Sequence, residues 1–249
     1  MKTQRMIAAI AGLALPFLAA QAQAAEIKLS ASTAVKTVLE DLLPQFEKTT
    51  GNKVVVTIAP AAVLKTQIDQ GAAFDVAILT VPITDSLVKE GKADTARTVI
   101  AHAGIGIAVR KGAAKPDIST TEAFKRALLN AKSVGYTAGG ASGVYLATLF
   151  GKLGIADEMK PKLKLLRGPA GEAAASGEVE IGMTQISEIL PYTQAELVGP
   201  LPSDIQSYTY FSAAMAVASK EQDASKALIR YLATPAALAV IKGKGMEPG

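Results

Sequence analysis

The chain has 249 residues, with 26 Lys and Arg against 22 Asp and Glu, one histidine and no cysteine. The lack of cysteine excludes disulfides, thiolate metal sites and a cysteine nucleophile, and the lone His102 offers no histidine pair for zinc. The formal net charge is only +4, and Lys2 and Arg5 supply two of the positive charges. A charge this small predicts no nucleic-acid partner, and the residue types predict no metal site.

The first 24 residues have the pattern of a secretory signal peptide. Lys2 and Arg5 precede an apolar run over residues 6–20, and Ala22-Gln23-Ala24 is a small-x-small cleavage site. The run is too short for a comfortable membrane span of roughly 20 residues. We therefore predict cleavage after Ala24 and export of the mature chain to the periplasm.

Short apolar segments that favour strands alternate with amphipathic helical patterns, which predicts parallel sheets built from βαβ units. After the first expected strand, apolar residues recur at helical spacing from Val35 to Phe46, and Gly51 marks the end of that helix. The expected strands cover residues 27–29, 53–58, 75–79, 133–136, 163–166 and 179–183.

Two further segments interrupt this alternation and favour longer strands that cross between two lobes. They are residues 103–112, where Ile105, Ile107 and Val109 alternate with small residues, and residues 208–220. The sequence therefore predicts an α/β protein of two lobes with a ligand cleft between them. One lobe would contain residues 25–102 plus 208–249, and the other residues 103–207.

Four turns of small residues lie where an expected strand passes into an expected helix. Helix starts have free backbone N–H groups and the positive end of the helix dipole, so four such turns around one cleft favour an anion site. The turns cover residues 30–35, 59–64, 139–145 and 167–173. With Gln185, which follows the strand at 179–183, they supply the candidate ligand residues Ser32, Thr33, Ala61, Ala62, Ser142, Gly143, Val144, Tyr145, Arg167 and Gln185.

Two of these turns have specific chemistry. In the turn at 139–145 the backbone N–H groups of Ser142, Gly143 and Val144 would face the anion, with Ser142 either capping the helix or donating to the ligand. Arg167 follows a strand and precedes a helix, where its guanidinium could bind a carboxylate through two hydrogen bonds. The glycine-rich stretches match neither a nucleotide nor a dinucleotide motif, so no cofactor is expected.

The order and spacing of several motifs resemble the type II periplasmic solute-binding proteins, particularly the molybdate-binding family. The motifs are "IKLSASTAVKTVLEDLLPQFEKTTGNKVVV", "LKTQIDQGAAFDVAIL", "SGVYLATLFGKLGI" and "GEVEIGMTQISEIL". The resemblance implies a monomer whose two lobes close over a small anion and which delivers that anion to the membrane subunits of an ABC importer.

The resemblance transfers its ligand residues incompletely. The family's first ligand serine corresponds to Ala34 in this sequence, and its second to Ala61. Near the first position, hydroxyl groups are instead supplied by Ser32 and Thr33. Its ligand tyrosine falls on Gln185, and Ser142 stands where the family uses a backbone amide. Missing hydroxyls and an added arginine favour an organic carboxylate over molybdate or tungstate.

The stretches "SGVYLATLF", "EVEIGMTQISEI" and "PDIST" are also similar to the aconitate isomerases, which implies an alternative function on the same fold. Interconversion of cis- and trans-aconitate needs carboxylate anchors and one base near the acidic C–H. Arg167 and Ser142 could anchor the carboxylates, and Glu188, Glu172 or Tyr136 could serve as the base. The sequence favours the binding protein and leaves the choice of base open.

Overall fold

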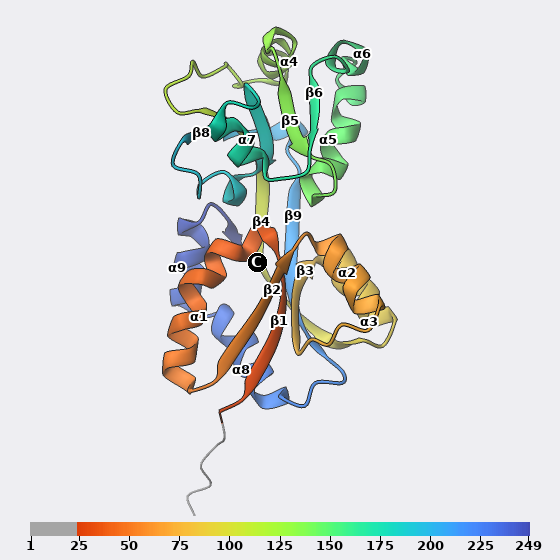
Figure 1. Ribbon diagram of the computed structural model, residues 1–249, viewed down its shortest axis with the longest axis vertical. Coiled ribbons are helices and arrows are strands. Elements are labelled where there is room, and N and C mark those ends of the chain that lie inside the picture. The colour runs from red at the N-terminus through yellow and green to blue at the C-terminus, as the bar shows by residue number, and fades with distance from the viewer. Residues whose placement is uncertain (1–23) are drawn as a thin grey trace, which may run out of the picture.

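The computed structural model describes residues 24–249, so the predicted signal peptide lies outside the described residues except for Ala24. Figure 1 shows an elongated molecule in which helices surround a lower and an upper group of strands, joined by the two long strands β4 and β9. We call the lower group lobe 1 and the upper group lobe 2. The predicted α/β architecture of two lobes is confirmed.

Lobe 1 is built on the strand order β2-β1-β3-β9-β4. Strands β2, β1 and β3 are parallel, whereas β9 runs antiparallel to both β3 and β4. Its strands are β1 (Glu26–Ser32), β2 (Lys53–Ala59), β3 (Val76–Thr80), β9 (Tyr208–Ala216) and the first part of β4 (Ala93–Arg110), with β10 (Glu247–Pro248) on β4. Its helices are η1 (Thr33–Val35), α1 (Lys36–Thr50), α2 (Ala61–Asp69), α3 (Val81–Lys89), α8 (Gln222–Leu232) and α9 (Pro235–Gly243).

Lobe 2 is built on the strand order β4-β7-β5-β6, with β8 also on β4. Here β5 is parallel to β6 and β7, and β4 is antiparallel to β7 and β8. Its remaining strands are β5 (Val134–Thr137), β6 (Leu163–Leu166), β7 (Ile181–Gln185) and β8 (Ala195–Pro200). Its helices are α4 (Thr121–Asn130), α5 (Ala141–Lys152), α6 (Ala156–Met159), α7 (Ala170–Ser176), η2 (Ile186–Glu188) and η3 (Ser203–Ile205).

Strand β4 belongs to both lobes and changes partners within one residue step. Gly104 is the last residue of β4 paired with β9, opposite Tyr208, and Ile105 is the first paired with β7. At this step the side chain of Gln206 donates to the Ile105 carbonyl (3.0 Å) and accepts from the Ile105 N–H (2.9 Å). The lobe boundaries at residues 103 and 208 stay a prediction. The step at which β4 changes from β9 to β7 lies next to residue 103, and Tyr208 is opposite Gly104 there.

Each lobe has its own hydrophobic core. In lobe 1 the apolar face of α1 packs on the sheet, burying Val38, Leu42 and Phe46, and Gly51 ends the helix in the left-handed conformation (φ 74°). In lobe 2 the buried Phe124, Leu146 and Phe150 gather around β4, β5 and β7. Separate cores are the arrangement expected of units that can move relative to each other as rigid bodies.

The six short strands predicted from apolar runs are all present, whereas the long segments differ in extent. Strand β4 begins at Ala93, ten residues before the predicted crossing. The prediction missed this first part because it is polar, lies at the surface and lacks an alternating pattern. Strand β9 ends at Ala216, since Val217 is exposed and the chain turns there, so the prediction of strand to residue 220 is wrong. Strand β8 was not predicted.

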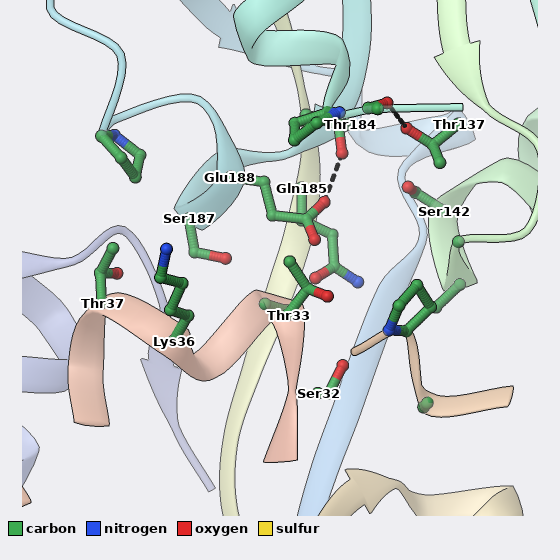
Figure 2. A pocket seen from close by; sticks show the side chains of 18 of the residues that line it. Ser32, Thr33, Lys36, Thr37, Thr137, Ser142, Thr184, Gln185, Ser187 and Glu188 are labelled. Atoms are coloured by element: carbon green, nitrogen blue, oxygen red, sulfur yellow. Dashed lines mark hydrogen bonds between the residues drawn. The ribbon is translucent and has the colours of Figure 1, made fainter. Parts of the chain in front are cut away.

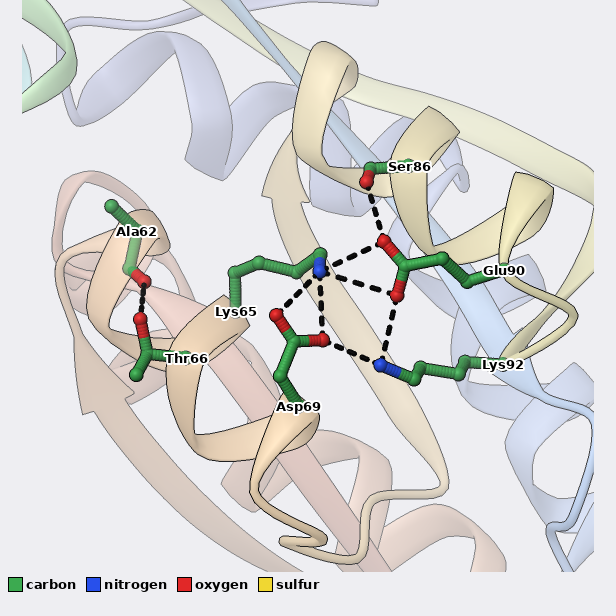
Figure 3. A network of polar contacts seen from close by, with 7 residues as sticks. All are labelled: Ala62, Lys65, Thr66, Asp69, Ser86, Glu90 and Lys92. Carbon is green, nitrogen blue, oxygen red and sulfur yellow. Dashed lines mark hydrogen bonds and ion pairs between the residues drawn. The ribbon is translucent and has the colours of Figure 1, made fainter.

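An exposed network of ion pairs ties the end of α2 to the end of α3 (Figure 3). Lys65 lies 2.6 Å from Asp69 and 2.9 Å from Glu90, and Lys92 bridges the same two carboxylates. Hydrogen bonds from Lys92, Lys65 and Ser86 lower the pKa of Glu90 to about 2. This network stabilises the outer face of lobe 1 through several weak, salt-sensitive contacts.

Within residues 24–249, no single helix has the length and apolar character needed to cross a membrane. Helices α8 and α9 meet that test only as a pair bent by 61°. The same residues contain no group of three or more His, Asp or Glu side chains placed to hold a metal ion.

Candidate functional site

A cavity of about 320 Å³ lies between the lobes and is lined by residues from all four turns singled out in the sequence. This volume is at the lower end of the ~300–1,000 Å³ typical of small-molecule sites. Lobe 1 contributes Ser32, Thr33, Ala34, Lys36, Thr37, Glu40, Pro60, Ala61 and Phe211. Lobe 2 contributes Thr137, Gly140, Ala141, Ser142, Arg167, Gly168, Pro169, Thr184, Gln185, Ser187, Glu188, Pro191 and Tyr192.

The lobe 1 wall is formed where β1 ends and the chain turns into η1 and α1. Ser32 is extended (φ −60°, ψ 144°) and directly precedes the short η1 turn, so the hydroxyls of Ser32 and Thr33 both reach the pocket. Lys36 and Thr37, in the first turn of α1, extend this wall (Figure 2). The Lys36 ammonium lies 3.7 Å from Glu40 and adds a positive charge that the sequence interpretation did not include.

The lobe 2 wall combines the start of α5 with the loop that carries Arg167. The Thr137 hydroxyl donates to the Gly168 carbonyl (2.8 Å), which fixes this loop against the end of β5. Arg167 is exposed at the edge of the pocket, and Ser142 is a buried part of the pocket lining. The two walls thus each present one cation and at least one hydroxyl.

Two buried polar side chains at the end of β7 lack hydrogen-bond partners. Gln185 lies opposite Ile105, where β4 changes partners, and Ser187 follows in η2. Both side chains are 2% exposed, yet the Gln185 Oε1 and Ser187 Oγ atoms have no partner among the described residues. Because an unpartnered buried polar group is costly, these atoms indicate a polar ligand.

Glu188 points into the centre of the pocket from η2 (Figure 2). Its carboxylate accepts a hydrogen bond from the Thr184 hydroxyl (2.5 Å), and the Gln185 N–H donates to it as well. Burial raises the pKa of Glu188 above its ordinary value, and these two hydrogen bonds offset part of that increase. Of the three bases that the sequence left open, Glu188 is the one that lines the pocket.

The other two candidate bases lie elsewhere. Tyr136 is buried in the core of lobe 2, with its ring centroid 6.1 Å from that of Phe150. Glu172 lines a neighbouring hollow that shares Arg167, Gly168 and Pro169 with the pocket. Neither side chain lines the pocket, and a role as the base stays a prediction for each.

Four of the candidate ligand residues have no side chain in the pocket. Val144 is 67% exposed, and its N–H already donates to the Gly140 carbonyl (3.3 Å). The Tyr145 hydroxyl donates to the Ile205 carbonyl (2.7 Å), so this ring packs within lobe 2. Ala62 is exposed on α2, and Gly143 is buried, and neither residue lines the pocket.

The start of α5 also differs from the prediction. Gly140, and not Ser142, is the N-cap, and no side chain caps the helix. Ser142 is therefore the second residue of the helix, with its side chain in the pocket. The N–H groups that lack an acceptor in the helix are those of the first three residues, from Ala141 to Gly143.

We expect Gly143→Ala to destabilise the fold, because a Cβ there would lie 2.0 Å from the Thr137 carbonyl oxygen. Overpacking of this kind costs about 1–3 kcal/mol, more than the gain in helix propensity of about 1 kcal/mol. Gly139→Ala is the matched control, because nothing lies within 4 Å of its added Cβ. Urea unfolding of both variants measures the difference, and equal stabilities would contradict the close approach.

The raised pKa of Glu188 also predicts how stability depends on pH. Above the ordinary value of 4.5 the folded state retains a proton that the unfolded state has lost. The free energy of unfolding contributed by Glu188 therefore falls as the pH rises from 4.5 through the raised pKa. We expect the melting temperature of Glu188→Gln, without ligand, to equal that of the parent below pH 4.5 and to exceed it increasingly at higher pH. Parallel melting curves across this range would contradict the expectation.

The fold and the pocket define a class of protein, namely two-lobed binding proteins that hold a small polar ligand between α/β lobes joined by two strands. The chain belongs to the family of bacterial extracellular solute-binding proteins, whose model matches residues 27–247. The predicted fold class and the family resemblance are therefore confirmed.

The individual relatives include both an isomerase and binding proteins. The chain is 34% identical to an aconitate isomerase of Pseudomonas sp. over 94% of this chain and 91% of the relative. It is 30% identical to the molybdate-binding protein ModA of Azotobacter vinelandii over 95% of each chain. The solved periplasmic molybdate-binding protein of that organism has the same fold (TM-score 0.74, 20% identity, 90% of this chain and 99% of that one). A tungstate ABC transporter structure from Geobacter sulfurreducens also has this fold (TM-score 0.68, 17% identity, 88% and 98% covered).

Proposed function

We propose that the protein captures a small organic polycarboxylate in the cleft between its lobes, in the periplasm, for delivery to an ABC importer. The observation that supports this most is the pair of cations on opposite walls of the pocket, Lys36 from lobe 1 and Arg167 from lobe 2. A ligand with two or more separated carboxylates could contact both. A ligand that contacts both lobes also favours the closed arrangement.

Charge and size both favour a carboxylate over a tetrahedral oxyanion such as molybdate. A single compact oxyanion would leave much of a 320 Å³ cavity to water. A guanidinium matches the planar geometry of a carboxylate through two parallel hydrogen bonds. The hydroxyls of Ser32, Thr33 and Ser142 supply further donors at the ends of the ligand.

A panel of ligands tests the proposal by thermal shift and isothermal titration. The panel contains citrate, propane-1,2,3-tricarboxylate, cis- and trans-aconitate, malate, succinate, molybdate, tungstate and sulfate. We expect the polycarboxylates to raise the melting temperature, since a ligand at 100 times its Kd adds about 2.7 kcal/mol to stability. Stabilisation by molybdate or tungstate alone would overturn the choice of ligand class.

The second candidate function is isomerisation of aconitate, which Glu188 and the 34% identical relative support. In this reaction an allylic C–H proton passes to a carboxylate oxygen, the double bond moves by one position, and the proton returns to the other end of the allyl system. A carboxyl group of raised pKa inside the pocket suits both transfers. Lys36 and Arg167 would hold the substrate carboxylates.

Turnover separates the two candidates. The purified protein is incubated with cis-aconitate and with trans-aconitate, and both isomers are followed by chromatography. An isomerase gives the same equilibrium mixture from either side, and Glu188→Gln stops the conversion without loss of the fold. Binding of both isomers with no conversion by the parent would leave capture as the function.

A further inference from the structure

The carboxylate of Glu188 is held inside the pocket without a cation. Its two hydrogen-bond donors are neutral, namely the Thr184 hydroxyl and the Gln185 N–H. None of the ion pairs within residues 24–249 includes Glu188. A site for anions thus contains a half-buried acidic group whose charge no neighbour neutralises at ion-pair distance.

The other charged and titratable groups around Glu188 come from four segments. On the facing wall, α1 presents Lys36 and Glu40, which pair with each other at 3.7 Å. The loop before α7 presents Arg167, and α7 presents Glu172. Tyr192 follows η2, and its pKa is raised by burial and then by the charges of Glu172 and Glu188. Lobe 2 therefore contributes one cation, Arg167, and two carboxylates, Glu172 and Glu188, to this region.

An anionic ligand in this pocket meets a carboxylate of the same sign. Two carboxylates in a shared, poorly solvated site do not both stay ionised, because like charges at close range raise the proton affinity of the pair. A proton shared between two carboxyl groups converts this repulsion into a short, charge-assisted hydrogen bond. The unpartnered Ser187 Oγ and Gln185 Oε1 atoms belong to side chains that line the same pocket as Glu188 (Figure 2).

We propose that Glu188 binds the ligand as a protonated carboxyl group that donates a hydrogen bond to a ligand carboxylate, so that one proton is taken up from solvent with each anion bound. This inference rests on the proposed capture of a polycarboxylate. It makes Glu188 a ligand-binding residue and makes capture stronger in acid. No covalent bond is formed or broken apart from that of the transferred proton.

Isothermal titration with propane-1,2,3-tricarboxylate tests the inference. Titrations at pH 7.0 to 8.5, where the probe carboxylates are ionised, are carried out in buffers with different ionisation enthalpies. We expect an uptake of about one proton per ligand where Glu188 is ionised in the free protein, and an affinity that falls by up to about tenfold per pH unit. Tight binding with no proton uptake would overturn the inference and leave the proposed function standing. No binding of any polycarboxylate would overturn both.

Two variants assign the proton to Glu188. Glu188→Gln, which keeps the shape of the protonated group, is expected to bind with no proton uptake and with an affinity independent of pH. Thr184→Val removes the hydroxyl that stabilises the ionised form, so the fall in affinity is expected to move to higher pH. A Glu188→Gln variant that is folded by its melting curve and retains the pH slope of the parent would overturn the assignment.

Discussion

Arg167→Ala is expected to weaken binding of a polycarboxylate by about 2–5 kcal/mol, or from about 30-fold to several thousand-fold. The guanidinium lies at the mouth of the pocket on the loop that Thr137 fixes, and domain closure would take it out of water together with its partner. Its removal leaves a ligand carboxylate desolvated and unpaired. Isothermal titration with propane-1,2,3-tricarboxylate measures the loss.

Two further variants make this measurement specific. Arg167→Lys keeps the charge but loses the paired hydrogen bonds, so an intermediate loss is expected. Lys115→Ala is the control, since Lys115 is paired with Glu196 (2.7 Å) on the outer surface of lobe 2. Similar small effects of Arg167→Ala and Lys115→Ala would make Arg167 an ordinary surface residue and would remove the main support for a carboxylate ligand.

Asp75→Ala is expected to reduce the free energy of unfolding by about 3–6 kcal/mol, because two hydrogen bonds to a buried carboxylate are lost. Asp75 Oδ2 accepts from the Lys28 N–H (2.8 Å), and Oδ1 accepts from the Ser219 hydroxyl (2.7 Å). These bonds join β1, the start of β3 and the segment after β9 at one point. Urea unfolding of the parent and the variant gives the difference.

Smaller changes at the same point serve as controls. Ser219→Ala removes one of the two bonds and should cost about half as much, and Asp75→Asn keeps an acceptor oxygen. Asp75 lies at the opposite end of β3 from Thr80, away from the pocket, so ligand affinity per folded molecule should not change. A loss of affinity equal to the loss of stability would contradict the separation of this contact from the site.

Much of the fold could be predicted because each lobe repeats short apolar strands and amphipathic helices. The pattern from Val35 to Phe46 located α1, and the run at 163–166 located β6 to the residue. The first part of β4 was missed, because a strand whose outward side chains are charged, such as Arg97, resembles a surface loop in sequence. Secondary structure could thus be predicted from the sequence where one face of the helix or strand is buried.

The candidate site was predictable at the level of turns and less so at the level of side chains. Ser32, Thr33, Ala61, Ser142, Arg167 and Gln185 line the pocket, and their role in binding stays a prediction. Lys36 and Thr37 were missed because they are the first two residues of α1, where the sequence showed only a helix pattern. Val144 and Tyr145 do not line the pocket, because the Val144 N–H donates to the Gly140 carbonyl at the start of α5 and the Tyr145 hydroxyl donates to the Ile205 carbonyl.

The pairing of β9 with β3 has a consequence for the order in which the molecule assembles. Val76 lies opposite Met215, so this contact closes a far longer loop than the pairing of β5 with β6, where Val134 lies opposite Leu163. Closing a long loop costs more chain entropy, and distant contacts form late. Lobe 2 is therefore expected to reach its native structure before the lobe 1 sheet is complete. Since each wall of the pocket comes from a different lobe, the capacity to bind ligand should arise only in the final step of refolding.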